Sequence, residues 1–200
     1  DKLPKVLQLF NNMATEICEG QQYDVDFESQ EHVAIEEYLK MIRLKTAVLL
    51  ATALKMGSYI AGASTEQQDM LYEFGINIGL AFQIQDDILD VWGNPETFGK
   101  AVGGDISCNK KTYVALTAMQ LADSTTRKEL EQWFTQVLTD NTEKIAAVKT
   151  LYEQVGTRTK CEQAVEQYTA QALYLLNQLP QNQATEQLRQ LANKLNTRKN

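Results

Sequence analysis

Hydrophobic residues recur at steps of three and four along most of this 200-residue chain, which is the spacing of one face of an α-helix. The first segment with this pattern runs from Leu3 to Cys18, and Gly20 offers a helix terminator. A polar and acidic connection is expected over residues 21–30, and a second helix over residues 33–56. The beginning of the chain therefore predicts two amphipathic helices joined by a polar linker.

Clusters of small and helix-breaking residues separate the remaining helices. A break over residues 57–64 precedes Thr65, which is expected to cap a long helix that ends near Trp92. Residues 96–109 carry glycines among charged residues and predict a long loop, and loops of this kind are frequently lids. Five more helices are expected, over residues 110–122, 127–139, 142–155, 158–179 and 184–197. The pattern predicts an all-α fold and one helical domain over residues 1–200.

The helix that ends near Trp92 is unusual because it carries carboxylates inside an apolar stretch. Asp86, Asp87 and Asp90 fall, with Gln83, on one stripe when successive residues are rotated by 100°. Like charges three and four residues apart repel by about a few tenths of a kcal/mol, and by more once they are partly desolvated. A cation is therefore expected opposite the stripe. Mg²⁺ is the economical candidate, since it takes oxygen ligands and is often shared between carboxylates and a substrate phosphate.

Composition narrows the class of protein. The hydrophobic fraction of 44% and the charged fraction of 22% are ordinary for a soluble globular domain. No run of about 18 apolar residues occurs, so no membrane span is expected, and no secretory leader is visible. The net charge of −7 argues against non-specific nucleic-acid binding, which needs a basic surface. Three widely spaced cysteines predict free thiols in a reducing compartment, so we expect a cytoplasmic protein.

Lysines near the carboxylate helix are the candidate cations of a site. Lys45 precedes Thr46 in the middle of an apolar helix, where it either extends its ammonium group to solvent or holds an anion. Lys100 lies in the glycine-rich loop, and Lys110 and Lys111 open the next helix. Lysines in such a loop are usually exposed to solvent, and a glycine-rich loop alone is a weak indication of phosphate binding. Together, however, carboxylates, inward lysines and a lid loop fit diphosphate chemistry, with apolar helices beside them for a hydrocarbon group.

The segment from Gly79 to Asp90 resembles the second aspartate-rich motif of the trans-isoprenyl diphosphate synthases, which are the farnesyl, geranylgeranyl and longer polyprenyl synthases. Three other motifs of this family have counterparts in the same order and spacing. Its GQ-x-x-D segment is similar to Gly20–Phe27, its KT motif to Lys45-Thr46, and its lid-like GK…GGD…NKKT stretch to Phe98–Thr112. Ala101 is a departure, since proline is common there.

The resemblance implies a role for each matching charged residue. Asp86, with help from Asp87 and Asp90, would bind Mg²⁺ that bridges an allylic diphosphate. Lys45 and Lys100 would contact that diphosphate. The implied reaction is ionisation of the allylic diphosphate, attack by the double bond of isopentenyl diphosphate, and loss of a proton to the released diphosphate.

Other matching positions would complete the site. Thr46, partly through its backbone carbonyl, and Gln83 would line the region where the allylic cation forms. Lys110 would lie at the lid and contribute to substrate binding. Arg198 and Lys199 resemble a basic tail that can close on the homoallylic site, and a frayed, solvated end is the alternative. The family further implies an isoprenoid synthase helical bundle and a homodimer.

The resemblance also implies a first aspartate-rich motif and a GK-x-x-R segment upstream of Asp1, and this chain has neither. We therefore expect the chain to be the C-terminal portion of a larger synthase domain whose N-terminal helices are missing. We expect a short- or medium-chain prenyl synthase as the parent protein, and no activity from these 200 residues alone. A non-catalytic regulatory or structural subunit and a terpene cyclase are the alternatives.

Overall fold

The structure is a computed structural model that describes residues 1–94, 102–136 and 138–196, and no strand occurs within these ranges. The all-α prediction is therefore confirmed. In chain order the elements are α1 (Leu3–Ser29), α2 (Ile35–Ile42), the π-helical η1 (Arg43–Ala47), α3 (Val48–Ala61), α4 (Thr65–Trp92), α6 (Gly104–Ser107), α7 (Tyr113–Leu121), α8 (Ser124–Thr135), α9 (Thr142–Gln154), α10 (Thr157–Asn177) and α11 (Gln183–Asn196).

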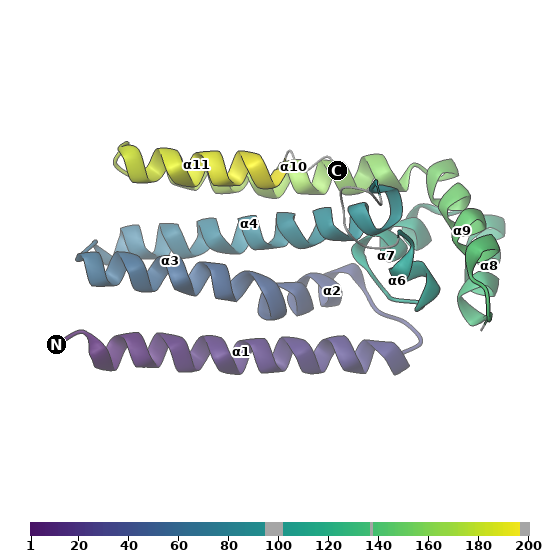
Figure 1. Ribbon diagram of the computed structural model, residues 1–200, viewed down its shortest axis with the longest axis horizontal. Coiled ribbons are helices and arrows are strands. Elements are labelled where there is room, and N and C mark those ends of the chain that lie inside the picture. Colours follow the sequence, from purple (N-terminus) through teal and green to yellow (C-terminus); the bar gives the residue numbers. More distant parts are fainter. Residues whose placement is uncertain (95–101, 137, 197–200) are drawn as a thin grey trace.

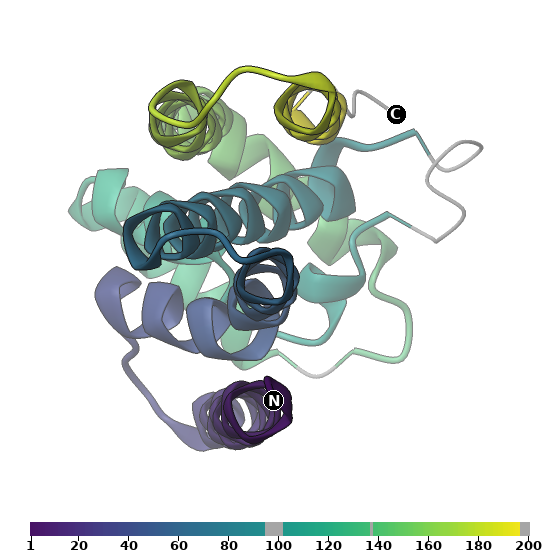
Figure 2. The ribbon, with the colours of Figure 1, turned by 90° about the vertical axis from the view of Figure 1, so that its left-hand side faces the viewer.

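The long helices are stacked in layers along one axis (Figure 1). Helix α1 forms one outer layer, α2, η1, α3 and α4 lie in the middle, and α10 and α11 form the other outer layer. In the end-on view, α4 passes through the centre between these layers (Figure 2). Helices α6 to α9 gather around one end of α4 (Figure 1). The helix that carries the aspartates is thus the central element of the bundle.

Helix α1 is longer than predicted, since it continues to Ser29 instead of ending near Gly20. The expected linker over residues 21–30 is mostly helical. The physical reason for a glycine inside this helix is close packing. A Cβ atom at Gly20 would lie 2.4 Å from the backbone nitrogen of Lys45 and 2.8 Å from the carbonyl carbon of Leu44. Gly20 therefore brings α1 against η1 and does not end the helix.

The predicted ends of the other helices are shifted by a few residues. The break expected over residues 57–64 is helical as far as Ala61, and Gly62, which has a positive φ of 83°, is the C-cap of α3. Ser64, and not Thr65, is the N-cap of α4, because its hydroxyl accepts a hydrogen bond from the Gln67 amide. Asp123 caps α8 by accepting hydrogen bonds from Thr125 and Thr126, so that α8 starts at Ser124. The end of α4 at Trp92 is as predicted. The expected loop after it contains the short helix α6, and its residues 95–101 lie outside the described ranges.

Between α2 and α3 the backbone forms one π-helical turn, η1, with no break in the helical path. A π-helical turn holds one residue more than an α-helical turn, and such turns occur frequently at functional sites. Lys45 and Thr46, which the sequence singled out, both lie in η1. The wider turn therefore falls on the two residues expected to point toward a ligand.

Two hydrophobic clusters hold the layers together. The larger one extends from α1 and α2 through η1, α3, α4 and α7 to α8, α9 and α10, and it includes the fully buried Val48, Ile84 and Val114. The smaller one joins α4 to α10 and α11 through Phe74 and Leu176. Each fully buried side chain of this size contributes about 1.5–3 kcal/mol to the stability of the fold. The core thus fixes α4 against helices on two sides.

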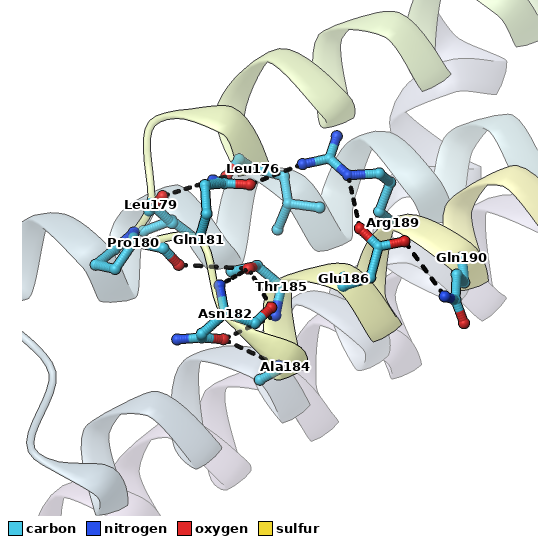
Figure 3. A network of polar contacts seen from close by, with 10 residues as sticks. All are labelled: Leu176, Leu179, Pro180, Gln181, Asn182, Ala184, Thr185, Glu186, Arg189 and Gln190. Atoms are coloured by element: carbon cyan, nitrogen blue, oxygen red, sulfur yellow. Dashed lines mark hydrogen bonds and ion pairs between the residues drawn. The ribbon is translucent and has the colours of Figure 1, made fainter.

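The turn between α10 and α11 is held by a polar network (Figure 3). Gln181 closes the end of α10, since its Nε2 donates hydrogen bonds to the carbonyl oxygens of Leu179 (2.7 Å) and Leu176 (3.2 Å). Asn182 Oδ1 accepts hydrogen bonds from the amides at the start of α11, including Ala184 N at 2.9 Å. Arg189 Nη2 joins the two halves by donating to Gln181 Oε1 at 2.9 Å. This network orients α11 so that it packs on α10 and α4.

Across the described residues, no helix is both long enough and apolar enough to cross a membrane. The helices that reach 18 residues or more, such as α4, carry polar and charged residues along their length.

Candidate functional site

A cavity of about 1340 Å³ lies beside the C-terminal half of α4. Its walls come from the end of α1, from α2, η1 and α4, from the segment of residues 105–112, and from α7 and α8. All of the predicted site residues that the structure describes line this cavity: Lys45, Thr46, Gln83, Asp86, Asp87, Asp90 and Lys110. The structure thus brings together motifs that are separated by up to 65 positions in the sequence.

Lys45 is held by a carboxylate that the sequence analysis did not assign to the site. Its Nζ lies 2.6 Å from Asp24 Oδ2, across the close contact between η1 and α1. Both side chains are about one-third exposed and line the cavity. Lys45 is therefore neither an unpaired buried charge nor a surface lysine, and Asp24 orients its ammonium group. The position of Asp24 in the GQ-x-x-D segment is the feature of the sequence that could have assigned it to the site.

Thr46, Gln83 and Asp87 form a chain of hydrogen bonds along one wall of the cavity. The Thr46 hydroxyl donates to Gln83 Oε1 at 3.2 Å, and Gln83 Nε2 donates to Asp87 Oδ1 at 3.2 Å. Gln83 and Asp87 are four residues apart on α4, so that one helical turn aligns them. This chain fixes the rotamer of Gln83 and the direction of its amide oxygen.

Asp87 is the buried centre of this wall, with only 3% of its surface exposed. Its Oδ2 accepts hydrogen bonds from the Tyr38 hydroxyl at 2.6 Å and from the Tyr113 amide at 3.0 Å. Both carboxyl oxygens are thus engaged by groups from α2, α4 and the start of α7. Burial raises the pKa of Asp87 to about 7, although all three hydrogen bonds oppose that rise. These contacts favour a positioning role for Asp87, whereas the sequence predicts that it helps to bind Mg²⁺, which stays a prediction.

The raised pKa of Asp87 predicts how stability depends on pH. Because the folded-state pKa of about 7 is above the ordinary value of 3.8, the folded state holds a proton that the unfolded state releases. The contribution of Asp87 to the free energy of unfolding is complete below about pH 4 and is lost as the pH rises through about 7. Without Mg²⁺, we expect the wild type to lose on the order of 3 kcal/mol between pH 4 and pH 8 relative to Asp87→Asn.

Urea unfolding of both proteins at several pH values, in the presence of a chelator, measures this difference. Asparagine is a suitable reference because it has no charge to titrate. Asparagine also keeps the hydrogen bond to Gln83 if the Gln83 side-chain amide flips by 180°. The asparagine NH₂ group would then donate to Gln83 Oε1. Parallel pH profiles for the two proteins would show that Asp87 does not titrate in this range.

Asp90 connects α4 to the segment that begins at Gly103. Its Oδ2 accepts a hydrogen bond from the Asp105 amide at 2.9 Å, and its backbone oxygen accepts one from the Gly103 amide at 2.6 Å. Burial, followed by the charges of Asp105 and Asp86, raises the pKa of Asp90. Asp105 in turn lies 3.3 Å from the Nζ of Lys110, and it is the main cause of the raised pKa of Lys110.

Asp86 differs from its neighbours because its carboxylate is available. It lines the cavity, is partly exposed, and accepts no hydrogen bond from the residues that the structure describes. Among the described ranges, no three Asp, Glu, His or Cys side chains converge closely enough to hold a metal by themselves. The hard oxygen donors of Asp86 and Asp90 fit Mg²⁺ when further ligands come from water and phosphate, as is usual for this ion.

Apolar side chains also line the cavity. They come from α2, α7 and α8, namely Met41, Ile42, Ala115, Leu116, Met119 and Phe134. The cavity thus offers carboxylates and lysines to a charged head group and apolar side chains to a hydrocarbon tail. Lys100 and Arg198 lie outside the described residues, so their predicted roles stay predictions.

The fold and the cavity define a class of all-helical proteins that can hold an anion with bound metal beside an apolar wall. Residues 1–155 match the family model of the polyprenyl synthetases, and the chain belongs to this family. The family resemblance inferred from the four motifs is thus confirmed.

Relatives of known function are similar over much of the chain. It is 36% identical over 186 residues to the geranylfarnesyl diphosphate synthase of Natronomonas pharaonis, a match that covers 89% of this chain and 50% of that protein. It is 40% identical over 129 residues to a short chain isoprenyl diphosphate synthase of Methanocaldococcus jannaschii, with 64% and 39% covered. The chain spans about half the length of the curated relatives it matches.

Solved structures agree with this assignment. The chain superposes on a geranylgeranyl pyrophosphate synthase with a TM-score of 0.93 and 43% identity, over 100% of this chain and 62% of that one. It superposes on a geranylgeranyl pyrophosphate synthase from Corynebacterium glutamicum with a TM-score of 0.90 and 30% identity, over 99% and 56% of the two chains. That second protein is complexed with isoprenyl diphosphate and magnesium.

Proposed function

We propose that the protein is a prenyltransferase that condenses isopentenyl diphosphate with an allylic diphosphate to give a short- or medium-chain prenyl diphosphate. The observation that carries the proposal is the position of the available carboxylate of Asp86 in one cavity with Lys45, Lys110 and an apolar wall. The names of the similar proteins support the same reaction class.

The chain's own residues divide the work at the reacting centre. Lys45, oriented by Asp24, binds and partly neutralises the allylic diphosphate, and Lys110 contributes a second positive charge. Asp86 and Asp90 would hold Mg²⁺, which when bound supplies further stabilisation of the departing diphosphate. Breaking the bond between the allylic carbon and oxygen leaves a cation, which the oxygens of Thr46 and Gln83, hydrogen-bonded to each other, would stabilise.

The remaining steps need no protein nucleophile. The double bond of isopentenyl diphosphate attacks the allylic cation and forms the new carbon–carbon bond. A proton is then lost to the released diphosphate. The apolar wall excludes water from the hydrocarbon chain, so that the cation is not quenched by hydrolysis. A homodimer is proposed with this activity, as the family resemblance implies, and light scattering tests it.

Incubation with labelled isopentenyl diphosphate, an allylic primer and Mg²⁺ tests the activity. We expect labelled prenyl diphosphate from the longer parent protein, and none from residues 1–200 alone. Consumption of the primer without incorporation of label would indicate a terpene cyclase instead. No consumption by the parent protein, together with stimulation of a separate synthase, would indicate a non-catalytic subunit.

A further inference from the structure

Lys144 in α9 is the least exposed charged residue in the described part of the chain, with 0% of its surface exposed. It lies outside every motif that the sequence analysis selected. Its Nζ donates hydrogen bonds to Asn109 Oδ1 at 2.5 Å and to the backbone oxygen of Gln136 at 3.4 Å. Both acceptors are neutral, and no ion pair of Lys144 occurs among the described residues. Burial lowers the pKa of Lys144, as expected for an ammonium group away from water.

Stability alone does not account for a lysine at this position. Taking an ammonium group out of water costs free energy unless it is well paired, and two neutral oxygens offset that cost only in part. Replacement of buried charges by apolar side chains of similar volume is often neutral or stabilising. A methionine in place of Lys144 would fill nearly the same space without this cost. The specific property of the lysine is its charge-assisted hydrogen bond to Asn109.

Asn109 lies in the segment that carries Asp105 and Lys110 at the cavity. It is the only non-glycine residue with positive φ (53°) among those described, a conformation that asparagine tolerates better than most residues. The next residue is Lys110, whose amide donates to the Asp105 backbone oxygen at 2.9 Å. The conformation at Asn109 therefore sets the direction in which Lys110 leaves α6.

Helix α9 contacts both ends of the segment of residues 103–110. Lys144 binds Asn109 at one end, and at the other end the side chain of Ile145 packs against Gly103, where a Cβ atom would lie 2.7 Å away. On its other side the segment is bound to Asp90 through the amides of Gly103 and Asp105. The residues 103–110 are thus clamped between α9 and the aspartate helix.

We propose that Lys144 is a positioning residue: by holding Asn109, it fixes the segment that presents Asp105 and Lys110 to the cavity. It thereby increases the affinity of the site for diphosphate with bound Mg²⁺. The link to diphosphate rests on the proposed function, whereas the mechanical role of Lys144 does not.

Hydrogen exchange measures the mechanical role without any ligand. The amides of Cys108, Asn109 and Lys110 donate to the backbone oxygens of Gly104, Ile106 and Asp105, and these hydrogen bonds protect them from exchange. We expect Lys144→Met to increase their exchange rates about tenfold or more, with the melting temperature unchanged or higher. Lys149→Met, on another side of the same helix, should change neither. Unchanged exchange in Lys144→Met overturns the proposal, whatever the elongation assay shows.

Calorimetric binding of inorganic diphosphate in the presence of Mg²⁺ measures the effect on the site. We expect Lys144→Met to weaken binding about tenfold, in the range found for residues that orient other ligands. Asn109→Gly, which keeps the positive φ but removes the acceptor, should weaken it similarly, and the double variant no further. Additive losses in the double variant would show that Lys144 does not act through Asn109 and would overturn the proposal. If the wild type binds diphosphate but the parent protein makes no prenyl product, only the proposed function is refuted.

Discussion

Asp86→Asn is expected to weaken the binding of diphosphate in the presence of Mg²⁺ by about 100-fold or more. Loss of a residue that merely orients a metal ligand already costs about 10–100-fold, and Asp86 is the carboxylate with available oxygens. An amide keeps the size of the side chain but loses the charge that attracts the cation. Because Asp86 accepts no hydrogen bond from the described part of the chain, the variant should keep its melting temperature.

Calorimetry with and without Mg²⁺ separates this role from a general electrostatic one. Without Mg²⁺, Asp86 repels an anion, so Asp86→Asn should bind diphosphate no worse than the wild type and somewhat better at low salt. The matched control is Glu66→Gln, which removes an exposed carboxylate from the first turn of the same helix. Equal affinities of the two variants with Mg²⁺ would count against Asp86 as a metal ligand.

Gly79→Ala is expected to destabilise the protein by about 3 kcal/mol or more, which corresponds to a fall in melting temperature of roughly 6–12 °C. A Cβ atom at Gly79 would lie 2.4 Å from the Cα and 2.5 Å from the Cβ of Ala47. Neither atom belongs to a flexible side chain, so η1 and α4 must move apart. This movement would also separate Thr46 from Gln83, and we expect the activity of the parent protein to fall by more than its loss of stability predicts.

Gly57→Ala provides the control for helix propensity. Gly57 lies in α3, and nothing lies within 4 Å of the position of its Cβ atom. Alanine is favoured over glycine in a helix by about 1 kcal/mol, so this variant should be slightly more stable than the wild type. Thermal unfolding of both variants provides the comparison. A Gly79→Ala protein as stable as Gly57→Ala would show that η1 and α4 are not in tight contact.

The sequence predicted the architecture because its signals are local. Three- and four-residue spacing marked the helices, and the breaker cluster at Trp92 marked the end of α4. It failed at Gly20, where glycine was interpreted as a terminator. A glycine that ends a helix and one that allows close packing look alike until the partner backbone is known. Only the tertiary structure shows that Lys45 occupies the space beside it.

The residues of the site could be predicted from the sequence, but the different environments of the three aspartates could not. Periodicity placed Asp86, Asp87 and Asp90 on one stripe about 100° wide, but α4 is covered on several sides by other helices. The stripe therefore extends from the cavity at Asp86 into the core at Asp87, and no pattern along the chain marks that boundary. Lys144 was missed for the same reason, since a lysine in a polar, amphipathic helix normally faces solvent.

The π-helical turn η1 places Lys45 and Thr46 on a local irregularity of an otherwise α-helical path. A π-helical turn is equivalent to an α-helix with one extra residue inserted. Without that residue, α2 and α3 would form one continuous α-helix. We therefore expect removal of a single residue from Arg43–Ala47 to keep the relative orientation of α2 and α3. The bulge that carries Lys45 and Thr46 toward the cavity would be lost. The chain thus places Lys45 and Thr46, two residues of the cavity wall, on a single π-helical turn within an otherwise α-helical path.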